Sequence, residues 1–389
     1  MKEPLRIGIE AQRLFRPRKH GLEIVALESL RELQSLDKLN QYFIFVKDDT
    51  DSQCLKETEN FHIVVLPSWN YAIWEQVVLP AAIRKYHLDI FHCTANTAPV
   101  INSVPTVITI HDIYFHKRAS LTGTTYQRFG NLYRRMIFPR LANFQHLVTV
   151  SEYEKNNIVS TLKMNPDTIT VVPNGVNPKF RVITDPGTLQ RVREKYQLPA
   201  NFILYFGNTA PQKNSRYTIH AFREINKQYP DITLAVVDPS DSYINSIASE
   251  LLTEEAKQKL LILGFIEHDD LPAVYTMARI FIFPSLQESF GLPILEAQAC
   301  ETPVITSNAA AMPETAGGSC LLIDPLDPLS LYISIDKILK DEDLSASLVQ
   351  KGKLNVQKYS WAQTAEKLLQ VYHMIHEKNS KKSLKNALH

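Results

Sequence analysis

Short, continuously apolar runs recur thirteen times along the chain, and segments with helical spacing of apolar residues separate them. The first seven runs are residues 6–10, 42–46, 62–67, 89–93, 106–112, 146–152 and 169–174, and the other six are 202–208, 232–238, 260–265, 279–285, 303–307 and 320–325. Runs this short and apolar are typical of parallel strands covered on both faces. The alternation of strands and helices therefore predicts two doubly wound α/β domains.

The length of the chain agrees with two domains, because 389 residues exceed what one hydrophobic core usually supports. Proline and glycine breakers lie between the two series of strands, at residues 177–200. We expect the first domain to cover residues 1–185 and the second to cover 186–360. The lysine-rich segment 376–389 is expected to be a polar, solvated end.

Charge and cysteine content exclude several classes of protein. A formal net charge of +1 lacks the basic excess of a nucleic-acid-binding protein. The four cysteines are scattered without a C-x-x-C pair, which favours buried thiols in a reducing compartment over a zinc site or disulfides. No apolar run is long enough to span a bilayer. We therefore expect a cytoplasmic protein without a structural metal.

The most informative segment, L-Q-E-S-F-G-L-P-I-L-E-A, follows the predicted strand 279–285. A helix is expected to begin at Leu292 or Pro293, because proline is favoured in the first helical turn. The backbone N–H groups of Phe290, Gly291 and Leu292 would then point out of a helix N-terminus, which attracts anions such as phosphate. Gly291 lets a ligand approach the backbone closely.

Two carboxylates, Glu288 and Glu296, flank this helix start. Carboxylates accept hydrogen bonds from hydroxyl groups, so a molecule with hydroxyls on both sides of a phosphate would suit the segment. A sugar nucleotide is such a molecule. Either glutamate alone is better explained as a helix cap that complements the macrodipole.

A lysine follows the first strand of the second series, in F-I-L-Y-F-G-N-T-A-P-Q-K-N, residues 202–214. The strand ends at Gly207 and Asn208, and Lys213 precedes a helical segment. A lysine at this position can neutralise a diphosphate. In isolation it would be interpreted as an ordinary surface lysine.

His111 and Asp112 follow the strand in T-V-I-T-I-H-D, residues 106–112, and so lie at the carboxyl end of a strand, where ligands of α/β sheets bind. The pair could equally cap the next helix. We predict that His111 is a site residue and that Asp112 is its structural neighbour.

The segment E-S-F-G-L-P-I-L-E-A resembles the signature of the retaining glycosyltransferases of glycosyltransferase family 4, the group 1 transferases. The similarity extends over nearly the whole chain. It implies the GT-B architecture, in which two Rossmann-like doubly wound parallel-sheet domains face each other across a cleft. It also implies that a C-terminal helix at residues 361–375 crosses back to the first domain.

The resemblance implies a role for each candidate residue. Glu288 and His111 would lie beside the donor sugar, and Glu296 would hold the ribose hydroxyls. Lys213 would bind the diphosphate, in the same loop as Gly207 and Asn208, and the backbone at Phe290, Gly291 and Leu292 would hold the sugar and diphosphate. The family often has Arg before this lysine, whereas Gln212 stands here.

The activity implied is transfer of a sugar from a nucleotide-diphosphate donor to an acceptor hydroxyl, with retention, in cell-surface polysaccharide or glycoconjugate synthesis. Neither a metal nor another cofactor is expected. The acceptor would be a saccharide or a lipid-linked molecule. Two alternatives remain open: a sugar-nucleotide epimerase of the related fold, and a sugar-nucleotide-binding protein with weak catalysis.

The first loop, R-L-F-R-P-R-K-H-G, is more basic than the glycine-rich loop usual in the family. Its residues Arg13, Arg18, His20 and Gly21 are candidates for the acceptor side, because a basic loop could attract a phosphate-bearing lipid carrier or the inner face of a membrane. A solvated loop is the equal alternative. The aromatic residues Trp69, Tyr71 and Trp74 of P-S-W-N-Y-A-I-W are expected to serve interdomain or core packing rather than sugar stacking.

Overall fold

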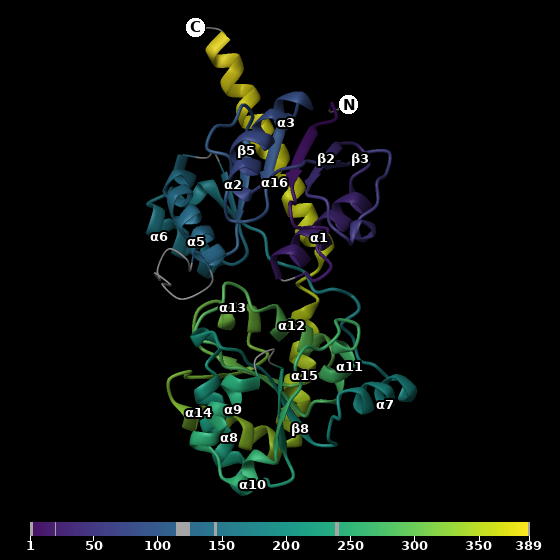
Figure 1. Ribbon diagram of the computed structural model, residues 1–389, viewed down its shortest axis with the longest axis vertical. Coiled ribbons are helices and arrows are strands. Elements are labelled where there is room, and N and C mark those ends of the chain that lie inside the picture. Colours follow the sequence, from purple (N-terminus) through teal and green to yellow (C-terminus); the bar gives the residue numbers. More distant parts are fainter. Residues whose placement is uncertain (1–2, 20, 114–124, 144–145, 238–240, 388–389) are drawn as a thin grey trace. The chain divides into compact units, whose positions relative to one another are not determined.

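The computed structural model describes residues 3–19, 21–113, 125–143, 146–237 and 241–387 (Figure 1). The chain divides into two compact units: residues 1–175 with 361–389, here called the N-terminal unit, and residues 176–360, the C-terminal unit. The division precedes the predicted boundary at 185/186. The chain passes between the units twice, and the residues next to these two boundaries pair with each other: the backbone N–H of Val176 donates to the carbonyl of Tyr359 over 3.0 Å.

The N-terminal unit is built on a parallel sheet with the strand order β3-β2-β1-β4-β5-β6-β7. Its strands are β1 (Arg6–Glu10), β2 (Gln41–Val46), β3 (Phe61–Val65), β4 (Ile90–Cys93), β5 (Thr106–Ile110), β6 (His146–Thr149) and β7 (Ile169–Val171). In this register Ile7 of β1 lies between Tyr42 of β2 and Ile90 of β4. Strands β1, β2, β4, β5 and β6 are buried at every residue or at every residue but the first, because helices cover both faces of the sheet.

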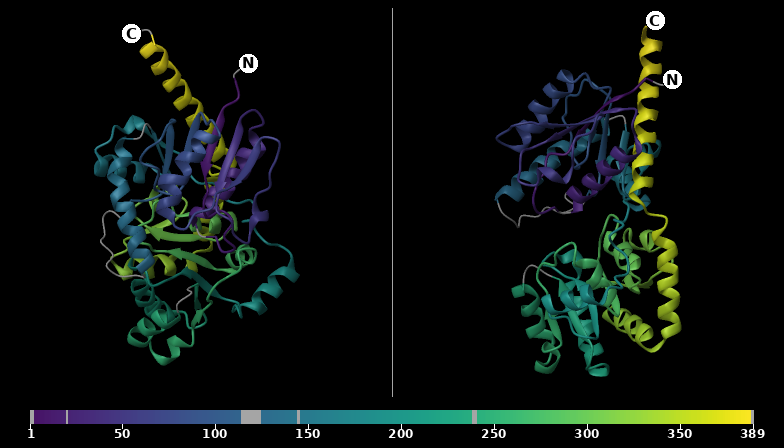
Figure 2. Two further views of the ribbon diagram at one scale, coloured as in Figure 1. Left: turned by 45° about the horizontal axis from the view of Figure 1, so that its top comes forward. Right: turned by 90° about the vertical axis from the view of Figure 1, so that its right-hand side faces the viewer.

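Alternate strand residues face the two helical layers. Tyr42 and Ile44 pack in one core with α1 (Gly21–Leu36) and α16 (Trp361–Ala387), whereas Phe43 and Phe45 pack in the other core with Trp74 and Phe138. The right-hand view of Figure 2 shows α16 on one side of the sheet. The second layer comprises α2 (Tyr71–Ile73), the π-helical turn η2 (Trp74–Val78), α3 (Leu79–Lys85), α5 (Thr125–Ile137), η3 (Phe138–Asn143) and α6 (Glu152–Leu162). Two further short turns are η1 (Ser52–Cys54) and η4 (Pro166–Thr168).

The C-terminal helix is longer than predicted. Helix α16 continues from Trp361 to Ala387, so residues 376–387 are helical where a polar tail was expected beyond a helix at 361–375. The segment contains no glycine or proline after Trp361, and its lysines and glutamates are good helix formers. Once the buried first turns of α16 are docked, adding polar turns costs little, because only nucleation is unfavourable.

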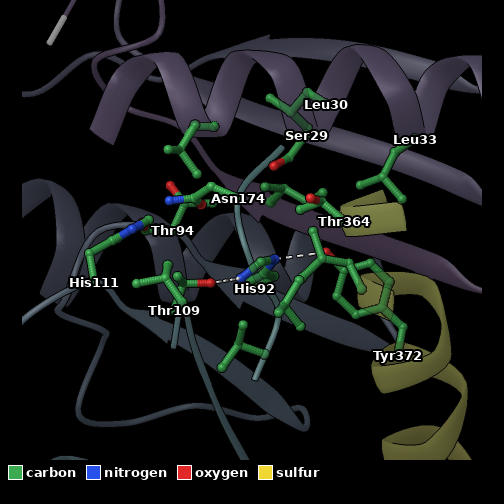
Figure 3. Close-up of a pocket in the computed structure, with 17 residues that line it drawn as sticks. Ser29, Leu30, Leu33, His92, Thr94, Thr109, His111, Asn174, Thr364 and Tyr372 are labelled. Atoms are coloured by element: carbon green, nitrogen blue, oxygen red, sulfur yellow. Dashed lines mark hydrogen bonds between the residues drawn. The ribbon is translucent and has the colours of Figure 1, made fainter. Parts of the chain in front are cut away.

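A buried hydrogen-bonded chain fixes α16 to the sheet (Figure 3). Tyr372 of α16 bonds through its hydroxyl to Nδ1 of His92 over 2.7 Å, and Nε2 of His92 bonds to Oγ1 of Thr109 over 2.7 Å. Burial lowers the pKa of His92 from 6.5 to about 3, so the imidazole stays neutral in the folded protein. The unfolded chain binds a proton there below pH 6.5, so this site makes the unit less stable as the pH falls from 6.5 towards 3.

Substitution Tyr372→Phe should lower the free energy of unfolding of the N-terminal unit by about 1–3 kcal/mol, because one nitrogen of a buried imidazole loses its partner. All three tryptophans, Trp69, Trp74 and Trp361, belong to this unit. Urea unfolding followed by tryptophan emission therefore measures the effect. The control is Tyr332→Phe in the other unit, whose hydroxyl bonds to Gln228 at the surface; it should leave the tryptophan-detected transition unchanged, and an unchanged transition in Tyr372→Phe as well would contradict the anchoring role.

The C-terminal unit has the parallel strand order β10-β9-β8-β11-β12-β13. Its strands are β8 (Phe202–Phe206), β9 (Thr233–Val237), β10 (Leu260–Ile262), β11 (Ile280–Phe283), β12 (Val304–Ser307) and β13 (Leu321–Ile323). Its helices are α7 (Pro186–Lys195), η5 (Pro211–Lys213), α8 (Ser215–Gln228), α9 (Asp241–Leu251), α10 (Glu254–Lys257), α11 (Leu271–Met277), α12 (Leu292–Ala299), α13 (Met312–Ala316), α14 (Pro328–Lys340) and α15 (Glu342–Val356). Each of the thirteen predicted strand runs contains a strand in the described part of the chain, which confirms the two doubly wound sheets.

Both sheets reverse their strand order at one point, between β1 and β4 in the N-terminal unit and between β8 and β11 in the C-terminal unit. Ligands of open α/β sheets bind beyond the carboxyl ends of the strands at this switch point. The loops after β8 and β11 carry Lys213 and Glu288, and the loops after β1 and β4 carry Arg13 and Thr94. The topology therefore directs the search for a site to these four loops.

Candidate functional site

Helix α12 begins at Leu292, as the proline at 293 predicted. Gly291 precedes it with a φ of 100°, in the left-handed region that favours glycine. Within the described residues no acceptor takes the N–H groups of Phe290, Gly291 or Leu292. Phe290 is buried, and its ring meets Tyr359 edge to face at 5.7 Å. The turn is thus held by the Phe290 side chain while its N–H groups stay available to an anion.

Substitution Gly291→Ala should lower the stability of the C-terminal unit by about 1–2 kcal/mol, since an L side chain pays for the left-handed conformation. The new Cβ would also lie 3.2 Å from Cδ1 of Ile294. Hydrogen exchange of α12 amides measures the change. The control is Gly187→Ala in α7, where the nearest atom to the Cβ is 3.6 Å away and no positive φ is needed; similar protection in the two variants would refute the argument.

Lys213 and Glu288 form an ion pair, with 2.7 Å between Nζ and Oε1. Each side chain is 22% exposed. The ammonium of Lys213 also lies 4.9 Å from the centre of the Phe283 ring, at the end of β11. The structure therefore brings together two residues that the sequence analysis selected from separate loops.

The two loops that carry this pair are tied together through their backbones. The N–H of Leu286 donates to the carbonyl of Gln212 over 2.8 Å. Asn208 accepts the N–H of Ala210 with its side chain over 2.8 Å, so this predicted donor-binding residue shapes the turn. At Gly207 a Cβ would lie 2.9 Å from the ring of Tyr205, so the glycine is required for packing. These hydrogen bonds therefore fix the backbone of the turn that carries Lys213.

Glu296 lies in the first turns of α12 and is partly buried. Its Oε2 accepts the hydroxyl of Tyr275 over 3.2 Å. Burial raises the pKa of Glu296 from 4.5 to about 7, against the lowering effects of Tyr275 and of the charge of Lys179. A carboxylate at this pKa is poised to gain its charge when hydroxyl groups bind, because hydrogen bonds to the charged form favour it.

In the N-terminal unit, His111 follows β5 and is buried. Its Nε2 bonds to the carbonyl of Thr94 over 2.9 Å, and its backbone N–H donates to Oδ1 of Asn96 over 2.6 Å. Burial lowers the pKa of His111. A neutral ring that donates from Nε2 carries its lone pair on Nδ1, so the tautomer is set by the Thr94 carbonyl.

Glu10, a carboxylate buried at the carboxyl end of β1, was not predicted from the sequence. Glu10 accepts the N–H of Gln12 over 2.9 Å and the N–H of Thr94 over 3.3 Å. Burial raises the pKa of Glu10 despite these bonds and the charge of Arg13. Because Thr94 also holds His111, Glu10 fixes the loop that orients the histidine. Its position at the end of the first strand was a signal that could have identified it.

A cavity of about 1110 Å³ opens at the switch point of the N-terminal unit. Its lining combines charged and aromatic side chains, which include Glu10, Arg13, Arg16, Glu23, Lys47, Trp69, Tyr71, Phe129, Tyr133 and Arg134. Buried Glu75 supports this wall, since it accepts hydrogen bonds from the hydroxyls of Tyr71 and Tyr133. Charged groups beside aromatic rings are suited to a ligand that has sugar rings and an anionic group.

The predicted acceptor residues differ in position. Arg13 lines the cavity, and Gly21 begins α1. Arg18 is exposed and is not among the lining residues of this cavity, and His20 lies outside the described residues. The loop therefore faces the cavity through Arg13, with Arg16 beside it.

Trp69 does not pack in the core of its unit. It is 98% exposed and lines the cavity, whereas Trp74 is buried in the core as expected. The π-helical turn η2 begins at Trp74, directly after α2. This irregular backbone could not be recognised from the spacing of apolar residues.

In the part of the chain that the structure describes, no group of three or more His, Cys, Asp or Glu side chains is placed to hold a metal ion. None of the described helices combines the length and the apolar character that crossing a bilayer requires.

Two doubly wound parallel-sheet units, each with polar loops at its switch point, define the class of GT-B proteins. A solved structure with this fold is the Anabaena protein Alr3699/HepE in complex with UDP-glucose, with a TM-score of 0.73 and 16% identity over 95% of this chain and 100% of that one. A glycosyltransferase from Rickettsia africae has a TM-score of 0.74 and 20% identity over 96% of this chain and 99% of that one. At these identities the similarity establishes the fold alone.

The sequence matches two family models, "Glycosyltransferase Family 4" over residues 20–180 and "Glycosyl transferases group 1" over residues 189–355. The chain belongs to these group 1 glycosyltransferases of family 4. Among curated proteins it is 29% identical to the serotype-specific mannosyltransferase WbdA of Escherichia coli over 60% of this chain. The match spans 29% of the length of that relative.

Proposed function

We propose that the protein is a retaining glycosyltransferase that moves a hexose from a nucleotide-diphosphate donor to a hydroxyl of a saccharide or lipid-linked acceptor, in polysaccharide synthesis. The observation that carries the proposal is the Lys213–Glu288 pair at the switch point of the C-terminal unit, together with the N–H groups that open from α12. In this proposal Lys213 binds the diphosphate of the donor, and Glu288 accepts hydrogen bonds from the hydroxyls of its sugar.

The ion pair exchanges partners when the donor binds. A diphosphate carries more negative charge than the Glu288 carboxylate, so it competes for the ammonium of Lys213. Glu288 is then released to accept hydrogen bonds from sugar hydroxyls, and His111 assists from the N-terminal unit. Glu296 accepts the ribose hydroxyls, and the N–H groups of residues 290–292 face the phosphate oxygens.

In the proposed reaction the bond between the anomeric carbon and the diphosphate oxygen breaks, and its electron pair leaves with the diphosphate. The acceptor oxygen bonds to the anomeric carbon on the same face, and its proton passes to the departing phosphate oxygen. Lys213 and the α12 N-terminus stabilise the charge that develops on the diphosphate, which is usually the largest contribution to such catalysis. Because the chain supplies this positive charge itself, we propose that neither a metal nor another cofactor is needed.

The acceptor is proposed to bind in the cavity of the N-terminal unit, beside Arg13 and Tyr71. The reaction is placed in the cytoplasm, where thiols such as the free cysteines of the described chain stay reduced. Contact with the inner face of the membrane is part of the proposal, because a lipid-linked acceptor would lie there.

A donor screen tests the proposal. UDP-, GDP- and ADP-sugars are incubated with the protein, with EDTA and with added Mg²⁺, and released nucleoside diphosphate is measured. GDP-mannose is the first donor to test, because the relative named above is a mannosyltransferase. We expect slow release from one donor, unchanged by EDTA and lowered at least a hundredfold by Glu288→Gln.

The matched control is Glu250→Gln, which removes a carboxylate that is paired with Arg216 on the surface of the same unit. It should leave the release unchanged. An altered sugar without release of nucleoside diphosphate would instead indicate the epimerase, and tight nucleotide binding without turnover, with every acceptor tried, would indicate the binding protein. An inverted anomeric configuration in the product would contradict retention.

A further inference from the structure

Trp69 is an exposed aromatic side chain held on a fixed stretch of backbone, in the lining of the cavity of the N-terminal unit. The side chain of Asn70 accepts the N–H of Ile73 over 2.9 Å and so caps α2. The carbonyl of Asn70 accepts the hydroxyl of Ser68 over 2.9 Å and the N–H of Trp74 over 3.1 Å. The exposure of Trp69 is therefore not that of a loose loop, and a large ring held open in a cavity indicates a ligand.

Two tyrosines continue this aromatic surface. Tyr71 and Tyr133 line the same cavity, and their rings meet edge to face with 5.6 Å between the ring centres. Both hydroxyls donate to the buried carboxylate of Glu75, and Nε2 of Gln76 donates to the hydroxyl of Tyr133 over 2.7 Å. Because these bonds engage both hydroxyls, the two tyrosines offer the cavity their rings.

The formal charges of the described cavity lining balance. The cations are Arg13, Arg16, Lys47 and Arg134, and the carboxylates are Glu10, Glu23, Asp48 and Asp49. Nη1 of Arg13 lies 3.9 Å from Oε1 of Glu23, and Nη1 of Arg16 lies 4.0 Å from the same oxygen. A phosphate group therefore meets no excess of positive charge in this cavity. Sugar hydroxyls, in contrast, can donate to the carboxylates and accept from the arginines and the lysine.

The cavity is larger than one sugar requires. Its volume of about 1110 Å³ exceeds the range of about 300–1,000 Å³ that is typical of pockets for a drug-sized ligand. Its lining runs from Glu10 and Thr94, which follow or end β1 and β4, to Trp69, which precedes α2. Thr94 also holds His111 through its carbonyl. One end of the cavity thus adjoins the predicted catalytic histidine, and the aromatic surface extends beyond it.

We propose that this cavity binds the end of a neutral oligosaccharide, and that Trp69, Tyr71 and Tyr133 stack on sugar rings other than the one that reacts. One face of a pyranose ring consists of apolar C–H groups with a small positive charge, and the face of an aromatic ring is negative, so the two attract each other. Trp69 then determines the length of glycan that the protein prefers. That this glycan is the acceptor rests on the proposed transferase function, whereas its binding does not.

The test is binding of the full chain to a glycan array. The array carries neutral glycans of one to six hexoses in several linkages, together with the same glycans bearing a phosphate group. We expect glycans of three or more hexoses to bind at least about tenfold more tightly than a single hexose, and a phosphate to change the affinity less than about threefold. Trp69→Ala should remove the advantage of the longer glycans and leave the binding of a single hexose unchanged. Trp69→Phe, which keeps an aromatic ring, should retain most of that advantage.

The control is Val77→Ala, which shortens an apolar side chain that is 61% exposed on η2 and is not among the described lining residues of the cavity. It should bind like the unchanged protein. Tryptophan emission gives a second readout, since Trp74 and Trp361 are buried and Trp69 is exposed. The longest glycan bound on the array, added in solution, should change the emission of the unchanged protein and leave that of Trp69→Phe unaltered.

Three results would overturn the proposal. The first is no binding to any glycan by a folded protein. The second is an affinity that does not depend on glycan length, or a length dependence that Trp69→Ala leaves intact. The third is binding to the phosphate-bearing glycans alone, which would make charge the recognised feature.

The donor screen on the same preparation separates this proposal from the transferase activity. Length-dependent glycan binding without release of nucleoside diphosphate would support the glycan site and count against the transferase. Release of nucleoside diphosphate without glycan binding would support the transferase and overturn the glycan site.

Discussion

Substitution Lys213→Met is expected to lower the turnover of the donor by about a thousandfold, with a smaller effect on donor binding. Methionine keeps most of the volume of lysine and removes the charge. The departing diphosphate would then lose the only side-chain cation that the structure places beside Glu288 among the described residues. Because the charge on the diphosphate grows as the bond breaks, the lost interaction matters most in the transition state. Steady-state release of nucleoside diphosphate measures kcat and KM separately.

A matched control for Lys213→Met exists in the same unit. Lys227 pairs with Glu224 over 2.7 Å and is 63% exposed. Lys227→Met should leave kcat unchanged within about twofold, since exposed ion pairs contribute little. The double variant Lys213→Met/Glu288→Gln should be no slower than the slower single variant, because the two side chains act on one leaving step. A loss confined to KM would mean that Lys213 binds the donor without assisting its departure.

Substitution Glu296→Gln is expected to have opposite effects on stability and on binding. The pKa of Glu296 is raised from 4.5 to about 7 in the folded protein, so the folded state holds this proton more tightly than the unfolded chain does. The site therefore destabilises the fold increasingly as the pH rises from 4.5 to 7, and the full cost is present above pH 7. A neutral glutamine should increase the free energy of unfolding at pH 8 by about 1–3 kcal/mol and leave it nearly unchanged at pH 4.

Binding should change in the other direction. If Glu296 accepts the ribose hydroxyls, the variant loses charge-assisted hydrogen bonds, and its affinity for UDP or GDP should fall by about ten- to a hundredfold at pH 8. For a UDP- or GDP-sugar, whose phosphates do not titrate in this pH range, the affinity of the unchanged protein should fall about tenfold per pH unit below pH 7 as the carboxylate gains its proton, while that of the variant stays flat. Calorimetry across pH 5.5–8.5 measures both binding and stability.

The control for Glu296→Gln is Glu301→Gln, just beyond the end of α12. Glu301 pairs with Lys353 over 2.8 Å and is 39% exposed. Its replacement should alter neither the pH profile nor the affinity. A flat affinity profile in the unchanged protein would show that the proton on Glu296 is irrelevant to nucleotide binding, and the ribose role would have to be abandoned.

The strands and the start of α12 followed from local patterns. Continuous apolar runs are forced by burial on both faces of a parallel sheet, so residues 202–206 and 280–283 were recognisable as strands wherever they lay in the sheet. The start of α12 followed from Pro293, whose missing N–H is tolerated only in the first turn. The length of α16 was predicted incorrectly, because a polar composition was taken as a sign of a frayed end although no helix breaker was present.

The candidate site was only partly accessible from the sequence. Glu288 and Lys213 were selected separately, and nothing in either loop says that their side chains are 2.7 Å apart. Lys213 and Glu288 are 75 residues apart in the chain. They meet because β8 and β11, whose following loops carry them, are neighbours in the sheet. The hydrogen bond from the N–H of Thr94 to Glu10 has the same origin, since Thr94 follows β4, the neighbour of β1 in the sheet.

By itself the sequence determined which residues form strands, where α12 begins and which family the chain belongs to. These depend on short-range periodicity, backbone sterics and a ten-residue motif. Only the tertiary structure decided that Lys213 meets Glu288, that Glu296 has a pKa near neutrality and that Trp69 is exposed while Trp74 is buried. Each of these properties depends on which distant segment covers a side chain or leaves it open to water, because desolvation and ion pairing act through space and not along the chain.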